Sequence, residues 1–414
     1  MIRIDQSQQQ QLELAQFKLK SLLDITLAIN ANCSAHDLLQ KYRDILCQGL
    51  NIRVISVFIV NQNWRNVLSA GVPETFGSNA DEVSSALSRF SDITRISDSN
   101  EPLLRYFDVV IPVFHKDIQL AYVLLGDITG GRLFGDESPV FSNLDFIQTL
   151  ANIVAVALEN KRLYKQALEQ ESLKKELEVA SKLQAMLIPS PDSLPKNEFL
   201  DIATFYQPHS MVGGDYYDFM KLNANEYGFC IADVSGKGIS AAILMSNFQA
   251  NLRILFQRSV PLINLIKDLN QNVNKNSQGE RFVTFFIGKY NVRNKVLYYV
   301  NAGNNPPLLF KKEYSELMYL TSGCVGLGML EEIPRLKVGS VHIGSGDKLL
   351  CFTDGLIEAE NELGKAFGTI PIEGALTIDG SAADVVHYLR SELEQFIGTA
   401  AVNDDVSIMG IDFL

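Results

Sequence analysis

Four short acidic motifs in the second half of the chain constrain its fold more than any other feature. Each places an aspartate at the edge of an apolar run, and three have glycine adjacent or within three residues. The motifs are Gly213-Gly214-Asp215-Tyr216-Tyr217-Asp218, Ala232-Asp233-Val234-Ser235-Gly236-Lys237-Gly238, Phe352-Thr353-Asp354-Gly355 and Asn403-Asp404-Asp405-Val406-Ser407. An isolated ionised carboxylate is costly beside a core, so converging aspartates are explained by hard divalent cations, which prefer oxygen ligands.

Turn chemistry is the competing explanation for each motif. Asp beside Gly at a strand end is common, because the Asp side chain bonds its own backbone and Gly supplies positive φ. For one motif alone the turn explanation is the stronger. Four motifs in one stretch of the chain favour a metal-dependent enzyme instead.

The composition bounds the class of protein. A chain of 414 residues with 47% hydrophobic residues is well supplied with core material and suggests two or three domains. The net charge of −12 argues against nucleic-acid binding and against docking to anionic lipid. There is no leader-like apolar segment and no long apolar run, so we expect a cytoplasmic protein with no membrane partner. The five cysteines are scattered and never form a CxxC pair, which indicates neither a disulfide framework nor a zinc site.

The first part of the chain predicts a small α/β domain. We expect residues 1–10 to be disordered and residues 11–160 to form one domain. An amphipathic helix is predicted over 12–30, strands over 54–60, 109–114 and 119–126, and loop with short helical pieces over 71–100. This region resembles a GAF domain in its first helix, its hairpin and its last helix. The resemblance implies a sensory module that binds an unknown small ligand or simply dimerises, and a ligand-free structural role is an equal alternative.

An unbroken helical period runs from Asn143 to Ile188, before Pro189. Residues on alternating three and four spacings, such as Val156, Leu163 and Leu173, form a weak heptad stripe. We therefore interpret 161–188 as a coiled-coil linker of a parallel homodimer. Because several seam positions are polar, a single long helix packed on its own chain is the alternative.

Residues 189–414 predict the second domain. Strand-like runs (227–232, 282–290, 296–300, 307–310, 348–353 and 406–411) are interrupted by helical patterns at 239–256, 261–274 and 383–396. This order predicts the α+β class, with a β-sandwich flanked by helices.

From about residue 183 onward the chain resembles the SpoIIE/RsbU-type phosphatases, the bacterial relatives of protein phosphatase 2C (the PPM class). The matching segments include residues 183–189, 213–218, 232–238, 301–303, 346–349, 352–359 and 404–407. The resemblance implies a cleft that holds two Mn²⁺ or Mg²⁺ ions. Asp215 would hold one metal, Asp233 would bridge both with the Val234 carbonyl nearby, and Asp354 and Asp404 would complete the second site.

The resemblance also implies that Asp215 and Asp233 act in catalysis by holding the paired cations, which activate a water molecule. No protein nucleophile is then required. Asp218 and Asp405 are candidates for orienting groups behind the ligands, or else turn-formers. Gly214 and Gly236 would let the backbone approach the metals, and a plain turn explains them nearly as well.

The chain departs from the family pattern at two places. Asn304 stands where relatives commonly carry a His after Asn-Ala-Gly, which touches no predicted ligand. The phosphate-gripping Arg of the eukaryotic relatives has no evident counterpart near residues 208–212.

The leading functional hypothesis is a signalling phosphoserine/phosphothreonine protein phosphatase. By resemblance, its substrate is a small phosphorylated anti-sigma-factor antagonist, and the GAF-like domain would regulate it through the helical linker. A non-catalytic docking module and a phosphohydrolase of small molecules are the alternatives.

Overall fold

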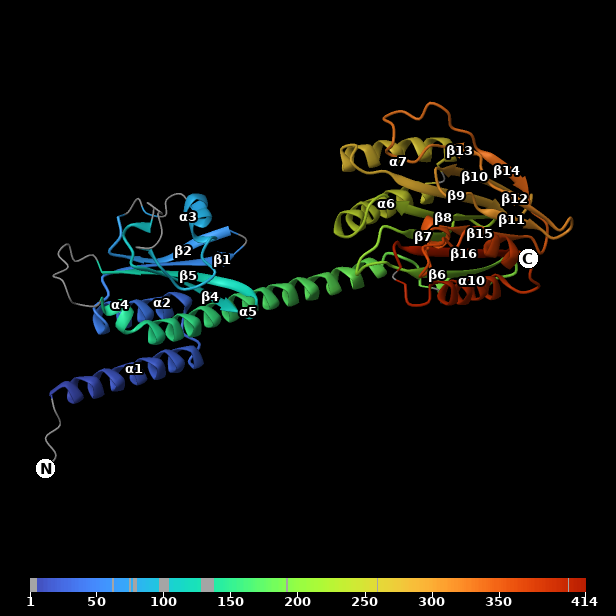
Figure 1. The fold of residues 1–414 in the computed structure, drawn as a ribbon. Helices are drawn as coiled ribbons and strands as arrows, with labels where there is room; N and C mark the ends of the chain where they lie inside the picture. Colours follow the sequence, from blue (N-terminus) through green and yellow to red (C-terminus); the bar gives the residue numbers. More distant parts are fainter. Residues whose placement is uncertain are drawn as a thin grey trace. The chain divides into compact units, whose positions relative to one another are not determined.

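The computed structural model describes residues 6–61, 63–73, 76, 80–96, 104–127, 138–190, 193–258, 260–400 and 402–414. The chain divides into two compact units, Met1–Glu171 and Ser172–Leu414 (Figure 1). Among the described residues, no helix combines the length and apolar character needed to cross a lipid bilayer.

The first unit is built on a five-stranded antiparallel sheet with strand order β2-β1-β5-β4-β3. One face packs against helices through Ile25, Leu38 and Leu150, and the opposite face carries a second cluster that includes Phe58 and Leu87. The elements are α1 (Gln6–Asn30), α2 (Ala35–Asp44), η1 (Ile45–Gly49), β1 (Val54–Asn61), β2 (Asn63–Ala70), α3 (Ala80–Leu87), β3 (Thr94–Arg95), β4 (Val109–His115), β5 (Ile118–Gly126), α4 (Pro139–Ser142) and α5 (Leu144–Ala185).

The predicted first helix, strand β1 and the β4–β5 hairpin are confirmed. The structure differs at the N-terminus: α1 begins at Gln6, so residues 6–10 are helical rather than disordered, and residues 1–5 lie outside the described residues. Strands β2 and β3 and helix α3 were not predicted as such. The GAF resemblance itself stays a prediction.

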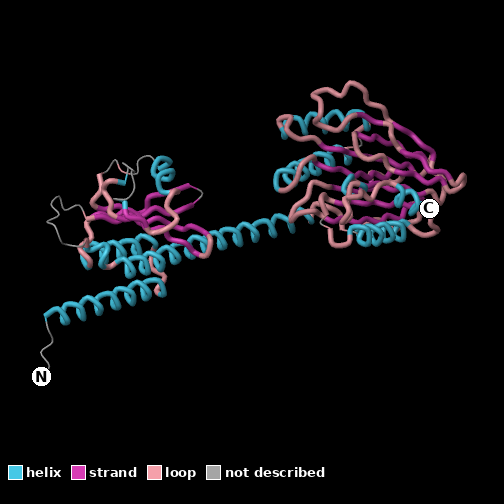
Figure 2. Tube along the Cα trace, in the orientation of Figure 1, coloured by secondary structure: helices cyan, strands magenta, loops and turns pink. Residues whose placement is uncertain are grey.

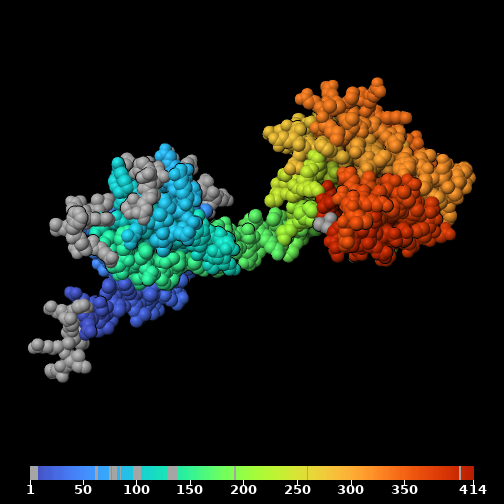
Figure 3. Space-filling model, in the orientation of Figure 1, coloured from blue at the N-terminus to red at the C-terminus, as the bar shows by residue number. Residues whose placement is uncertain are grey.

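Helix α5 confirms the long helical segment, although it ends at Ala185 rather than Ile188. The chain leaves the helix in a turn in which the Leu187 amide donates to the Gln184 carbonyl. Leu163 and Leu173 of the predicted seam are 49% and 55% exposed, and Figure 3 shows the middle of α5 as open surface. The exposed seam is compatible with a two-chain coiled coil, which stays a prediction.

The second unit is a sandwich of two sheets flanked by helices, as predicted (Figure 2). One sheet has the order β13-β10-β9-β8-β7, with β14 also paired to β10, and the other has the order β12-β11-β15-β16-β6. The elements are β6 (Leu200–Gln207), β7 (Tyr216–Lys221), β8 (Glu226–Val234), α6 (Ile239–Gln257), α7 (Leu262–Ser277), β9 (Val283–Asn291), β10 (Val296–Ala302), β11 (Leu308–Lys311), β12 (Glu316–Tyr319), β13 (Gly323–Cys324), β14 (Gly339–His342), β15 (Lys348–Phe352), α8 (Asp354–Ile357), α9 (Ile370–Leu376), α10 (Ala382–Ile397) and β16 (Val406–Phe413).

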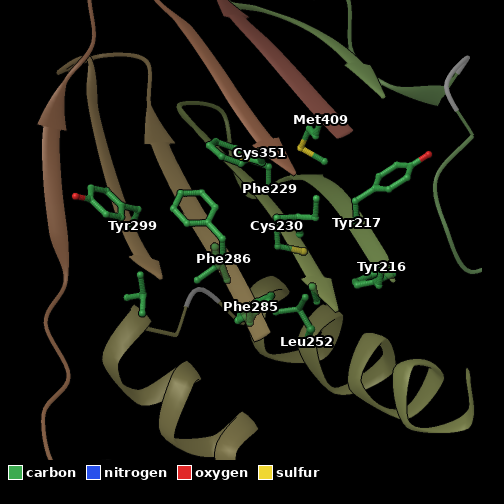
Figure 4. Packing of buried hydrophobic residues seen from close by; sticks show 14 of the residues in the cluster. Tyr216, Tyr217, Phe229, Cys230, Leu252, Phe285, Phe286, Tyr299, Cys351 and Met409 are labelled. Atoms are coloured by element: carbon green, nitrogen blue, oxygen red, sulfur yellow. The ribbon is translucent and has the colours of Figure 1, made fainter. Parts of the chain in front are cut away.

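Strand alternation produces the layers of this sandwich. Phe286 and Met409 lie in the core between the sheets, whereas Phe285 packs edge-on against Phe248 of α6 with ring centroids 5.0 Å apart (Figure 4). Leu350 faces the other way, into a cluster with the helices α9 and α10. The strand ends of the two sheets therefore lie on a shared side of the sandwich, and the residues that follow or precede the strands come together there.

Candidate metal centre

The four predicted ligands all lie at strand ends, two from each sheet. Asp215 immediately precedes β7 and Asp233 is the penultimate residue of β8; in the other sheet, Asp354 follows β15 by two residues and Asp404 precedes β16. Tyr216 pairs with Ala232, so β7 and β8 bring Asp215 next to Asp233. The apolar runs flanked by aspartate thus correspond to strands whose ends lie on one side of the sandwich.

Asp215 links the two sheets. Its Oδ2 accepts hydrogen bonds from Thr353 Oγ1 at 2.8 Å and from Ser407 Oγ at 2.6 Å, and both donors belong to the opposite sheet's end. The side chain is buried, and burial together with the neighbouring Asp233 charge raises the pKa of its carboxyl, while the two hydroxyls partly offset this. Asp215 is thus held in place by neutral donors and is receptive to a cation.

Asp233 lies amid the other acidic side chains. Burial, followed by the charges of Asp354, Asp404 and Asp405, raises its pKa to about 7. Burial and the Asp404 charge likewise raise the pKa of Asp354. These mutual effects show that the carboxylates share one local electrostatic environment, and a divalent cation would relieve their repulsion.

The donor set suits a hard divalent cation, because it consists of carboxylate oxygens with a backbone carbonyl beside them. Among the described residues, no three acidic, His or Cys side chains are already drawn together as a closed cation site. Mutual repulsion favours such a spread arrangement of carboxylates. The donor types therefore suit a hard divalent cation, and the side chains would have to move together to hold one.

Gly214 packs closely against the residues of the second acidic motif. A Cβ atom at this position would lie 2.8 Å from the Val234 carbonyl oxygen and 3.5 Å from Asp233 Oδ1. At Gly236, glycine is required for a different reason. Its φ is +84°, and a Cβ there would meet the Arg281 guanidinium at 1.9 Å, so it makes room for an arginine rather than for a ligand.

Arg281 was not predicted from the sequence. It donates to the Ser235 carbonyl at 2.5 Å and to Ser240 Oγ at 2.7 Å, which fixes the loop between β8 and α6. In the same loop, Lys237 lies 3.1 Å from Asp404 Oδ2 and also donates to the Asn403 carbonyl. Asp404 therefore already has a cationic partner from the loop that follows Asp233.

Asp405 supports the site by holding backbone. Its Oδ1 accepts from the His209 amide at 2.7 Å, and its Oδ2 accepts from the amides of Gly214 at 2.5 Å and Asp215 at 3.4 Å. The side chain is 7% exposed. Of the two alternatives for Asp405, a group that orients the ligands fits these contacts.

Asp218 is different, and neither alternative proposed for it fits. It lies inside β7 rather than in a turn, and its carboxylate receives Arg253 of α6 at 2.7 and 3.0 Å and the Tyr216 hydroxyl. It lies three positions after Asp215, and successive residues of an extended strand point to opposite faces. Asp218 therefore faces α6, and its buried carboxylate pairs with the partly exposed Arg253.

Gln184, near the C-terminal end of α5, bonds the same loop that carries Asp215. Its side-chain nitrogen donates to the Gly213 carbonyl at 2.6 Å, and its oxygen accepts from the Gly213 amide at 3.1 Å. The side chain is buried. These two hydrogen bonds tie the end of α5 to the loop that carries Asp215.

Asn304 stabilises the strand ends. Its amide nitrogen donates to the carbonyls of Asn305 at 2.9 Å and Phe352 at 3.3 Å, and its backbone amide donates to Asn301 Oδ1 at 2.9 Å. In agreement with the expectation, these contacts involve no predicted ligand.

Comparison with known proteins agrees with this geometry. Residues 223–414, just under half of the chain, match the family model of stage II sporulation protein E (SpoIIE). Over these residues the second unit is therefore similar to the SpoIIE/RsbU-type phosphatases.

Particular relatives follow. Phosphoserine phosphatase RsbU of Bacillus subtilis is 29% identical over 225 residues, which is 54% of this chain and 65% of that protein. Phosphoserine phosphatase RsbP of the same species is 26% identical, over 45% of this chain and 46% of that protein. The chain thus spans less than two thirds of the length of these relatives. The SiaA-PP2C domain of Pseudomonas aeruginosa shares the fold, with a TM-score of 0.53 and 19% identity over 60% of this chain and 100% of that domain.

Proposed function

We propose that this chain is a metal-dependent phosphoserine/phosphothreonine protein phosphatase of bacterial signalling. One observation carries the proposal: Asp233 lies beside Asp215, Asp354 and Asp404 where strand ends of the two sheets meet, and burial followed by the charges of Asp354 and Asp404 raises its pKa. Two relatives of this chain are named as phosphoserine phosphatases.

In the proposed site, Asp215, Asp233, Asp354, Asp404 and the Val234 carbonyl would hold two divalent cations, Mn²⁺ or Mg²⁺. Such ions, when bound, supply activated water near neutral pH and offset the charge of the phosphoryl oxygens. Thr353 and Ser407 fix the orientation of Asp215, and Asp405 fixes the backbone on either side of it. The protein residues thus supply ligand placement and charge, and no side-chain nucleophile is needed.

The proposed substrate is a phosphorylated protein like an anti-sigma-factor antagonist. Its phosphate is an anion, and the acidic edge would repel it unless cations are bound. Binding of the substrate would therefore depend on the metal. The protein is proposed to act in the cytoplasm.

We also propose that the first unit, a GAF-like homodimer, regulates the second through α5. The Gln184–Gly213 bonds give a physical route, since a rotation or shift at the end of α5 would pull on the loop that carries Asp215. In the full chain, Gln184→Ala is expected to lower Mn²⁺ affinity at least tenfold with little change in thermal stability. Unchanged affinity would show that this bond does not support the site.

The catalytic proposal is tested by phosphate release from phosphorylated antagonist proteins, with Mn²⁺ or with chelator. Wild type should require the cation, and Asp233→Asn should lose at least 100-fold in turnover. Asp268→Asn, which removes an exposed charge on α7, should keep full activity. Full Mn²⁺-dependent activity in Asp233→Asn would refute the bridging role.

Two further measurements separate the alternatives. A docking module would show no Mn²⁺ binding by calorimetry in the wild-type chain. A small-molecule phosphohydrolase would release phosphate faster from nucleotides than from phosphoproteins in the same substrate panel.

A further inference from the structure

A cavity of about 410 Å³ opens on the face of the first sheet that packs against α2 and α5. Its walls are mainly aliphatic and come from β1, β5, α2 and α5. The apolar residues lining it are Ala35, Ile59, Val60, Leu120, Ala155 and Leu158. A chamber of this size and character suits a small apolar ligand.

Cationic side chains surround the same cavity. Arg65, Lys161, Arg162 and Lys165 line it, with Glu159 as the acidic counterpart. Arg162 is engaged by both oxygens of Glu159, at 2.7 and 2.6 Å. After this pairing the lining keeps three positive charges, which favours an anionic ligand.

Arg65 is well placed for such a role. It pairs with Ile59 across β1 and β2, so it stands on the face of the sheet that lines the cavity. Lys161 donates to Asn32, and Lys165 lies 3.7 Å from Glu169 in an exposed ion pair of the weak kind. These contacts involve Lys161 and Lys165, so they leave the positive charge of Arg65 unchanged.

A narrower cavity of about 10 Å³ continues inward, and it shares Ile59, Ala155 and Leu158 with the larger one. Tyr42 is the one polar side chain that lines it, and it is 1% exposed. Within the described part of the chain, the Tyr42 hydroxyl has no hydrogen-bond partner. A buried hydroxyl without a partner is costly, so a ligand that supplies an acceptor gains there.

We propose that the two cavities form a binding site for a small carboxylate whose apolar body ends in a single oxygen acceptor. The carboxylate would face Arg65, Lys161 and Lys165, the body would lie on the aliphatic walls, and the terminal oxygen would accept from Tyr42. The narrow inner cavity has room for about one small group. A para-alkoxy aromatic acid has this chemistry. The site is independent of the proposed phosphatase activity.

The test uses three probes on the full chain by calorimetry: 4-methoxycinnamate, cinnamate, which lacks the methoxy group and with it the ether oxygen, and the methyl ester of 4-methoxycinnamate, which lacks the charge. Wild type should bind the methoxy acid about three- to tenfold more tightly than cinnamate, as one added hydrogen bond predicts. Arg65→Glu, an exposed change, should weaken both acids at least tenfold and leave the ester unchanged.

Tyr42→Phe should remove the preference for the methoxy acid and leave cinnamate affinity unchanged. Tyr122→Phe is the matched control, because the Tyr122 hydroxyl donates to the Phe90 carbonyl at 3.1 Å and does not line either cavity. The proposal is overturned if neither acid binds, if the preference survives Tyr42→Phe, or if Arg65→Glu changes only the oligomeric state, which would assign the cavity to a second copy of the chain.

Discussion

Replacing Asp233 by Asn should stabilise the protein when divalent cations are removed. In the folded chain, burial and the charges of Asp354 and Asp404 raise the Asp233 pKa from 3.8 to about 7. At about 1.4 kcal/mol per pKa unit, ionising Asp233 costs roughly 4 kcal/mol more in the folded than in the unfolded chain. Asn keeps the volume and removes the charge, but it cannot share a proton with Asp215. We therefore expect a gain of about half this cost, about 2 kcal/mol.

The sign of the pH dependence follows from the same shift. Asp233 binds its proton more tightly in the folded chain than in the unfolded chain. Its contribution to the free energy of unfolding is therefore fully present below pH 3.8 and is lost as pH rises through about 7. The stability that Asp233→Asn gains over wild type should accordingly be small in acid and reach its full value at pH 8. For a domain of this size, about 2 kcal/mol raises the unfolding temperature by about 4–8 °C.

Thermal unfolding followed by circular dichroism in chelator, at pH 5 and pH 8, measures this difference. Asp268→Asn is the control, because it removes one exposed charge far along α7. Adding Mn²⁺ at 100 times its dissociation constant should stabilise wild type by about 2.7 kcal/mol and Asp233→Asn by less. If Asp233→Asn unfolds at or below the wild-type temperature in chelator at pH 8, the electrostatic account of this site is wrong.

Three further predictions concern the supports of the site. Gly214→Ala places a Cβ 2.8 Å from the Val234 carbonyl oxygen and should lower Mn²⁺ affinity at least tenfold by calorimetry, and normal affinity would refute close packing there. Asp405→Ala removes the acceptor for three backbone amides and should cost about 10–100-fold in Mn²⁺ affinity, with unchanged binding contradicting its orienting role. Arg253→Met leaves the buried Asp218 carboxylate without its ionic partner and should lower the free energy of unfolding, measured in urea, by about 2–3 kcal/mol. This is less than the 3–5 kcal/mol of a fully buried pair because Arg253 is 43% exposed, and Mn²⁺ affinity should stay unchanged.

Strand position decided which parts of the fold could be predicted. In the described part of the chain, the strands predicted from apolar runs (β1, β4, β5, β8, β9, β10, β11, β15 and β16) all have a neighbour on each side. The strands that were not predicted lie at sheet edges or, like β14, pair with β10 alone. An edge strand shields less surface and can carry polar residues, as β2 does with Asn63, Arg65 and Asn66. Its sequence signal is correspondingly weak.

The position of the four aspartates at strand ends could be predicted because the end of an apolar run locates a strand end; their role as ligands stays a prediction. The role of Asp218 was misjudged although a signal existed, since its odd separation from Asp215 in an extended strand places the two on opposite faces. The partners Arg253, Gln184 and Ser407 could not be inferred. Each joins its acidic or backbone partner across a long stretch of chain, and only the packing of the sheets and helices brings them together.

The loop that carries Asp215 depends on two anchors of different origin. Asp405 holds the Gly214 and Asp215 amides from within the sandwich, whereas Gln184 holds Gly213 from the end of α5. The first anchor moves only if the sheets move, because Asp405 immediately precedes β16, which is paired on both sides with β15 and β6. The second can change with the helix alone. Under the proposed regulation, a signal that acts on α5 would therefore alter the proposed metal site at Gly213 without unfolding the domain, and Gln184 is the position where that control should be most sensitive.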